Sequence, residues 1–158
     1  MKFSTMAIAG ILFFWSLSSY ADEELAYPDG YRYWTHVKTL TLHEGHALEN
    51  PFKGIHHIYA NKKGIDGIKN GTFQDGSKIV FDLLKNKTVD HASAEGERVL
   101  LGVMVKDTSR FPHTGGWGFD AWAGDSRTNR LSNDGGRSCF ACHASQKNRD
   151  YVFSRWRD

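Results

Sequence analysis

The sequence predicts an α+β domain that consists mainly of an antiparallel β-sheet with flanking helices, one of them C-terminal. Its apolar residues come in short runs that alternate with polar residues, which is typical of strands. Clusters of Gly, Asn and Asp separate these runs, as turns do between neighbouring strands. With sixteen glycines and three prolines in 158 residues, the composition fits one globular domain rather than a disordered or collagen-like chain.

Five segments have the strand pattern, and turn dipeptides such as Asn70-Gly71 and Asp75-Gly76 fall between them. In chain order the expected strands are residues 37–42, 55–60, 78–84, 98–106 and 117–123. Residues 62–69 predict a short helix between the second and third strands. The strongest helical pattern begins at Ser138 and includes the apolar residues 151–153 near the terminus.

The first 21 residues have the pattern of a cleavable export signal. Lys2 precedes an apolar run over residues 6–17, and small residues precede a cleavage site after Ala21. A membrane span needs roughly 20 apolar residues, so an uncleaved anchor is the weaker alternative. No cysteine directly follows the apolar run, where a lipid would be attached. We therefore predict a signal peptide over residues 1–21 and a single periplasmic domain over residues 22–158, without a membrane anchor.

The charge balance excludes one broad class of partner. Twenty Lys and Arg against eighteen Asp and Glu give a formal net charge of +2. A nucleic-acid binder must neutralise many phosphates, and this balance does not provide for that. Two cysteines are also too few for a scaffold held together by disulfides.

Both cysteines lie in Cys139-Phe140-Ala141-Cys142-His143, the attachment motif of c-type haem. On a helix, positions i, i+3 and i+4 share one face, so Cys139, Cys142 and His143 are expected to point the same way. The thiols can add to the two haem vinyl groups, and His143 can then bind the iron as the proximal ligand. One motif predicts one covalently attached haem c. A redox disulfide and a zinc site are weaker alternatives, because no thioredoxin-like pattern and no second cysteine pair is present.

The group on the other side of the iron decides the function. Electron carriers fill the sixth position with Met or His, whereas gas-binding and catalytic haems leave it open. The only methionine after the signal, Met104, lies in an apolar run, where Met is more often a core residue. His43 and His46 lack the i, i+4 spacing of a zinc helix and are expected in a solvated loop. His56 and His57 alternate along a strand, so at most one of them faces the haem.

An ordered series of segments resembles the cytochrome P460 family. These segments are residues 31–34 (YRYW), 50–52 (NPF), 58–60 (IYA), 73–77 (FQDGS), 105–112 (VKDTSRFP), 116–119 (GWGF), 139–143 (CFACH) and 150–153 (DYVF). The resemblance implies a mainly antiparallel sheet with helices, and usually a homodimer. The family includes cytochromes P460, which oxidise hydroxylamine and carry a lysine cross-linked to the haem. It also includes cytochromes c-prime-beta, which lack that link and bind nitric oxide or carbon monoxide on a five-coordinate haem.

The resemblance favours the c-prime-beta branch. It implies that the cross-linking lysine follows the Asp-Gly-Ser turn, at a position that is Phe81 here. Strand periodicity puts Ile79, Phe81 and Leu83 on one apolar face. Lys85 has the same parity, but we expect it beyond the strand, in a solvated turn. In the c-prime-beta branch two phenylalanines cap the distal face, and Phe81 and Phe52 match them.

We therefore expect a monohaem cytochrome with an open sixth position under Phe52 and Phe81, and with His56 at the pocket edge. Aromatic side chains exclude water and offer iron no lone pair, and they give no hydrogen-bond donor to dioxygen. The expected ligand is nitric oxide, or another small diatomic such as carbon monoxide.

One alternative is hydroxylamine or nitric oxide oxidation, with Lys85 cross-linked and His56 taking protons. Another is electron transfer to a redox partner protein, with Met104 or a histidine as sixth ligand. Haem propionates usually bind Arg, Lys, Tyr or Trp donors, and the sequence offers too many to choose among.

Overall fold

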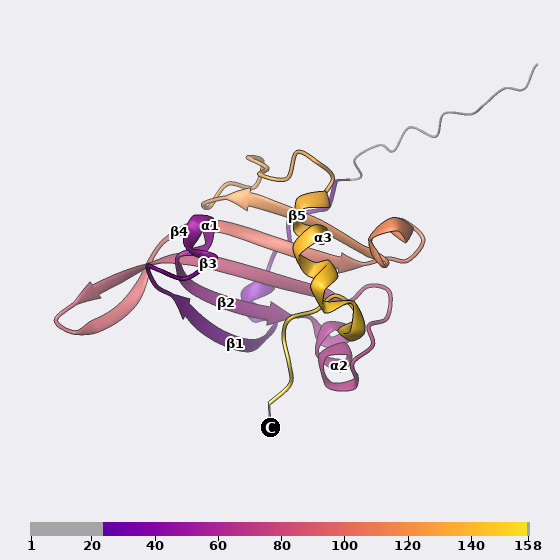
Figure 1. The fold of residues 1–158 in the computed structure, drawn as a ribbon, viewed down its shortest axis with the longest axis horizontal. Coiled ribbons are helices and arrows are strands. Elements are labelled where there is room, and N and C mark those ends of the chain that lie inside the picture. Colours follow the sequence, from indigo (N-terminus) through magenta and orange to yellow (C-terminus); the bar gives the residue numbers. More distant parts are fainter. Residues whose placement is uncertain (1–23, 158) are drawn as a thin grey trace, which may run out of the picture.

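The structure, a computed structural model, describes residues 24–157. The predicted signal peptide, residues 1–21, lies outside this range. The described chain forms a five-stranded antiparallel sheet in the order β1-β2-β3-β4-β5 (Figure 1). The strands are β1 (Thr35–Leu42), β2 (Gly54–Ala60), β3 (Lys78–Val89), β4 (Ala92–Lys106) and β5 (Trp117–Ala123). Each strand pairs with its neighbours in the chain, which confirms the predicted α+β class with a mainly antiparallel sheet.

Short helices flank this sheet. Those in the described part of the chain are η1 (Tyr31–Tyr33), α1 (Glu49–Phe52), α2 (Lys62–Asn70), η2 (Pro112–Thr114), α3 (Arg137–His143) and η3 (Ala144–Arg149). Helix α2 matches its prediction because the sequence supplies both ends. The Asn61 side chain accepts a hydrogen bond from Gly64 N at 2.8 Å, and Gly71 ends the helix at a φ of 79°. No helix within residues 24–157 is long and apolar enough to cross a membrane.

The hairpin of β3 and β4 corrects one prediction. Lys85 was expected in a turn, but β3 continues to Val89 and the turn is Asp90-His91, where both residues have positive φ. The extension pairs Asn86 with Glu95 and projects beyond the other strands (Figure 1). Most of its residues are exposed, so the sequence has no apolar alternation there to indicate a strand.

The C-terminal helix is shorter than predicted. Helix α3 ends at His143, and η3 follows it to Arg149. Asp150 and Tyr151 then adopt left-handed conformations, with φ of 50° and 65°, which end the helical path. The apolar residues 151–153 therefore belong to an irregular segment, in which Val152 is 3% exposed and packs into the core.

Each face of the sheet carries an apolar core, and the face on which α3 lies is called the α3 face. On this α3 face, Ile58, Met104 and Phe119 form a core with residues of α2 and with Val152. On the opposite face, Tyr31 and its neighbours from the N-terminal segment cover a second core. Because both faces are apolar, the central strands are nearly continuous apolar runs. Figure 1 shows α3 lying in front of β4 and β5.

A buried charge network fastens the N-terminal segment to the opposite face. The Asp82 carboxylate is fully buried and accepts hydrogen bonds from Arg98 Nε at 2.7 Å and from Tyr31 Oη at 2.5 Å. Burial alone would raise the pKa of Asp82, but the hydrogen bonds from Arg98, Tyr31 and Arg32 lower it below its usual value. Burial and the Asp82 contact raise the pKa of Tyr31 to about 12. Asp82 therefore remains ionised inside the fold.

Candidate haem-binding site

Helix α3 begins directly against β5. Gly136, just before it, has a φ of 77°, and a Cβ at this position would lie 2.7 Å from the Cβ of Phe119. Glycine therefore allows the helix to start this close to the strand. The Ser138 backbone N–H donates to the Asp134 carboxylate at 2.8 Å, which satisfies one N–H of the first turn. These contacts fix the orientation of the attachment motif relative to the sheet.

The two cysteines of the motif differ in their surroundings. Cys139 is half-buried and packs against the core of the α3 face, whereas Cys142 is exposed. The two cysteines do not form a disulfide bond with each other. Burial, and then the charge of Asp134, raise the pKa of the Cys139 thiol. Burial beside this apolar surface therefore favours the neutral thiol of Cys139 over the thiolate.

His143 is held in one tautomer. Its Nδ1 lies 2.7 Å from the carbonyl oxygen of Tyr151, and a carbonyl can only accept, so Nδ1 carries the proton. Burial lowers the pKa of His143 in spite of this hydrogen bond. The ring packs between Phe119 and Phe153, at centroid distances of 4.9 and 5.1 Å. Within residues 24–157, Nε2 forms no hydrogen bond, so a neutral imidazole keeps a lone pair for a metal ion.

Asp150 fixes the segment that carries this carbonyl. Its Oδ1 accepts from Lys106 Nζ at 2.6 Å and from Trp117 Nε1 at 3.2 Å, and its Oδ2 accepts from Phe73 N at 3.1 Å. Lys106 is only 6% exposed. The ion pair therefore anchors Asp150, and with it the left-handed turn that places the carbonyl of Tyr151 beside His143.

Phe52, Phe81 and His56 come together, as the sequence predicts. The ring centroids of Phe52 and Phe81 lie 5.9 Å apart, and those of His56 and Phe81 lie 4.8 Å apart. His56 pairs with Leu83 and Ile58 pairs with Phe81, so β2 stays in regular register through this region. Within this cluster, His56 Nε2 lies 2.5 Å from the Phe52 carbonyl oxygen. The His56 side chain therefore links the turn of α1 to β2.

An apolar platform lies on the α3 face, formed by Phe81, Gly102 and Ala121. These residues pair across β3, β4 and β5, and each is half-buried. Their sequence neighbours Leu101 and Trp122, on the opposite face, are 0% exposed. A Cβ at Gly102 would meet nothing closer than 3.5 Å, so no side chain is packed tightly over the centre of the platform. The middle of the sheet is thus apolar but incompletely covered on the side of the attachment motif.

These features fit a haem. The motif supplies two thiols and a neutral imidazole with a free lone pair, the platform supplies apolar surface, and Phe52 and Phe81 supply aromatic rings. Comparison with known families decides the assignment, because the sequence pattern of the family described as Cytochrome P460 matches residues 28–154. The chain belongs to the cytochrome P460 family. This confirms the resemblance seen in the sequence and makes the chain a c-type haem protein. Among curated proteins, none matches it.

The alternative functions of this cytochrome P460 chain need Lys85 as a cross-link to the haem or Met104 as a sixth ligand. Lys85 lies on the surface and Met104 lies in the core. Lys85 is 62% exposed and donates to the Glu97 carboxylate at 2.8 Å on the projecting hairpin. Met104 is 6% exposed and pairs with Ile79 and Phe119 within the core. Lys85 is thus solvated, as expected, although it lies in a strand and not in a turn.

Three other histidines of the cytochrome P460 chain, His43, His46 and His57, contact no residue of the attachment motif within residues 24–157. His43 and His46 are exposed before α1, and His57 faces away from the platform, because it pairs with Asp82 on the opposite face. Within residues 24–157, no group of three or more His, Cys, Asp and Glu side chains could hold a metal ion.

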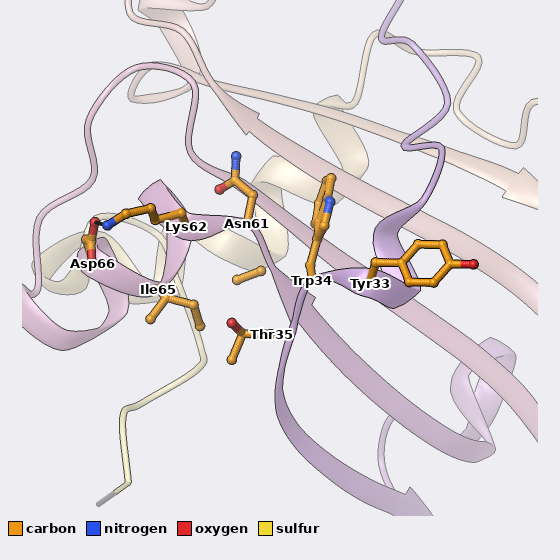
Figure 2. A pocket seen from close by; sticks show the side chains of 8 residues that line it. Tyr33, Trp34, Thr35, Asn61, Lys62, Ile65 and Asp66 are labelled. Carbon is orange, nitrogen blue, oxygen red and sulfur yellow. Dashed lines mark ion pairs between the residues drawn. The ribbon is translucent and has the colours of Figure 1, made fainter.

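A separate hollow lies at the start of β1 and α2 (Figure 2). It has a volume of about 490 Å³ and is lined by Tyr33, Trp34, Thr35, Ala60, Asn61, Lys62, Ile65 and Asp66. Lys62 and Asp66 form an ion pair at 3.5 Å along its rim. None of the predicted haem residues lines this hollow, which is therefore separate from the candidate haem site.

Sequence reasoning missed the residues that support His143. The Tyr151 carbonyl is a main-chain group, which no side-chain pattern reveals. Asp150 reaches Lys106 across 44 positions of the chain, so local spacing gives no sign of the pair. The one available signal was the segment 150–153, which the family resemblance includes.

Proposed function

We propose that this chain is a monohaem c-type cytochrome that binds nitric oxide, or carbon monoxide, at a vacant sixth position. The haem would be attached through Cys139 and Cys142, with His143 as proximal ligand. When bound, the haem iron supplies a coordination site for a small diatomic ligand. The observation that carries the proposal is the contact of Phe52 with Phe81, a residue of the platform, because neither ring has an atom that can bind iron.

The state of His143 supports its role as the proximal ligand. Its Nδ1–H is committed to the Tyr151 carbonyl, which leaves the Nε2 lone pair for iron. The rings of Phe119 and Phe153 restrict rotation of the imidazole. Attachment of the neighbouring thiols would then hold the iron close to Nε2.

His56 offers an acceptor and no free donor on the distal side. Its Nε2–H donates to the carbonyl of Phe52, and burial lowers its pKa, which favours the neutral ring. The remaining Nδ1 carries only a lone pair. Dioxygen on a haem is stabilised by a hydrogen-bond donor, which His56 does not provide, whereas nitric oxide and carbon monoxide do not need one. This difference favours the weakly polar diatomics.

The proposal also includes export, self-association and a redox partner. We infer that residues 1–21 direct export to the periplasm, where thiols of c-type cytochromes receive their haem, and that the mature domain acts as a homodimer. A redox partner protein would set the oxidation state of the iron. The resemblance to the c-prime-beta branch, with Phe81 in place of a lysine, supports gas binding over hydroxylamine oxidation.

Optical spectroscopy of the haem-loaded protein tests this function. We expect a high-spin ferrous spectrum with a Soret band at the ordinary c-type position, which shifts on addition of nitric oxide. The haem should resist acid–acetone extraction, and replacement of both Cys139 and Cys142 by Ala should make it extractable. A strongly red-shifted Soret band would instead indicate a lysine cross-link and hydroxylamine oxidation. A low-spin spectrum that does not change on addition of nitric oxide, and that becomes high-spin in Met104→Leu, would indicate an electron carrier.

A further inference from the structure

Lys38 lies at the end of the row that forms the apolar platform. In the register of the sheet, Lys38 of β1 pairs with Ile58, Ile58 with Phe81, Phe81 with Gly102, and Gly102 with Ala121. Residues that pair directly in an antiparallel sheet lie on the same face. Lys38 is therefore the charged member of an otherwise apolar row, at the edge strand of the sheet.

The ammonium group of Lys38 has no partner in the described chain. Within residues 24–157 it forms no hydrogen bond and no ion pair, although the residue is half-buried. Burial, and then the positive charge of Arg149, lower the pKa of Lys38. A half-buried cation without a counter-ion is unfavourable, which distinguishes Lys38 from the exposed lysines of the surface.

Arg149 brings a second positive charge to the same edge. Its Nη2 donates to the carbonyl oxygens of Val152 and Phe153, both at 2.8 Å, so the guanidinium is bound to the segment that packs on His143. These carbonyls are neutral and leave its charge uncompensated. The C-terminal segment runs from η3 toward the β1 side of the sheet (Figure 1), which accounts for the electrostatic effect of Arg149 on Lys38.

The charge of Lys38 also affects the cluster of Phe52, Phe81 and His56. Its charge is one of the causes that lower the pKa of His56, after burial and beside the charge of His46. Lys38 is thus within electrostatic range of His56 and of Arg149, which binds the segment that packs on His143. A cation in that position borders the space between His143 and Phe81, where the proposed function puts the haem.

We propose that Lys38, supported by the charge of Arg149, binds a carboxylate of the haem, one of its two propionates. The inference rests on the proposed function, since it requires a haem between His143 and Phe81. The apolar part of the macrocycle matches the platform, and its propionates need cationic or polar donors. Lys38 supplies such a donor at the one charged position of the row.

Reduction potentials and resonance Raman spectra of the haem-loaded protein test this contact. In Lys38→Gln, we expect a lower midpoint potential than in wild type, because a positive charge that disfavours the ferric state is removed. At a fixed applied potential, the ratio of ferric to ferrous protein should rise several-fold. The propionate bending bands should also shift. Lys38→Arg keeps the charge and should restore both properties towards wild type.

Lys62→Gln is the matched control, because Lys62 is 91% exposed and lies in α2. This variant should leave both readouts unchanged. Equal potentials and equal propionate bands in wild type, Lys38→Gln and Lys62→Gln would overturn the inference. So would a Lys38-dependent spectral response to added formate with unchanged propionate bands, which would indicate a site for free anions. A covalent bond between Lys38 and haem, seen by mass spectrometry, would overturn it as well. Absence of attached haem in wild type would instead contradict the proposed function.

Discussion

The Nδ1 atom of His143 and the carbonyl oxygen of Tyr151 lie 2.7 Å apart, and this contact organises the proximal side of the site. It selects the tautomer that leaves Nε2 free. The carbonyl reaches this position because Tyr151 has a φ of 65°, a conformation that costs energy in a residue other than glycine. The neighbouring Asp150 offsets that cost through its ion pair with the buried Lys106. A charge pair far from the motif in sequence thus determines the orientation of the proposed ligand.

Asp150→Asn is expected to destabilise the protein and disturb the proximal side. The variant leaves Lys106 with a buried positive charge, and loss of one partner of such a pair costs about 3 kcal/mol. Urea unfolding measures this loss. The ferrous spectrum of the loaded protein should also become heterogeneous, because the Tyr151 carbonyl is no longer fixed. Asp66→Asn is the control, since Asp66 and Lys62 form an exposed pair, worth about 0.5 kcal/mol. Similar losses in both variants would contradict the anchoring role of Asp150.

Phe81→Ala is expected to open the distal side to ligands. Removal of the ring leaves Phe52 and His56 without their shared aromatic neighbour, so carbon monoxide should associate several-fold faster in flash photolysis. Phe73→Ala is the matched control, because Phe73 is a buried ring that packs on Trp117 at 5.3 Å. That variant should lose stability without a change in the association rate. Equal rates in Phe81→Ala and wild type would argue against a distal cap.

The sheet could be predicted from the sequence because its strands alternate or are apolar throughout. Residues 117–123 form β5 as predicted, and β1 and β2 differ from prediction by one or two residues at their starts. The extension of β3 past Leu84 could not be foreseen, since residues 85–89 are mostly exposed. In an isolated hairpin both faces are solvated, so cross-strand hydrogen bonds define the strand and hydrophobicity does not.

The residues of the candidate site can be proposed from the sequence where they are close together in the chain, but not where they are far apart. Cys139, Cys142 and His143 follow from one motif, and Phe52 and Phe81 from a family resemblance. The partners of Asp150 come from three separate segments. Periodicity along a single strand cannot show that Lys38 stands in one row with Phe81, because the row depends on the register of three strands.

Stability should fall at mildly acidic pH because of His56. Burial lowers the pKa of His56 below its usual 6.5, so the unfolded chain takes up a proton at a higher pH than the folded one. The contribution is fully present above pH 6.5 and is lost as the pH falls through the folded value. Relative to His56→Gln, wild type should lose up to about 1.4 kcal/mol per pH unit in this window. Parallel stability curves for the two proteins, measured by urea unfolding between pH 5 and 8, would contradict this expectation.

Loss of the Asp82 carboxylate should destabilise the fold without changing ligand binding. Asp82 is 0% exposed, on the face opposite the platform, and holds Arg98 and Tyr31. Asp82→Asn leaves Arg98 without its buried partner, at a cost of about 3 kcal/mol. The nitric oxide spectrum should match that of wild type, because none of these contacts reaches the α3 face.

The same carboxylate should dominate unfolding in acid. The hydrogen bonds from Arg98, Tyr31 and Arg32 outweigh burial and lower the pKa of Asp82 below its usual 3.8, so its contribution is present above pH 3.8 and is lost as the pH falls through the folded value. Asp82→Asn should therefore show a weaker dependence of stability on pH below 3.8 than wild type. Asp125→Asn is the control, because Asp125 also pairs with Arg98 but is 82% exposed. If Asp125→Asn flattened the acid limb as much as Asp82→Asn, the exposed pair and not the buried carboxylate would control acid stability.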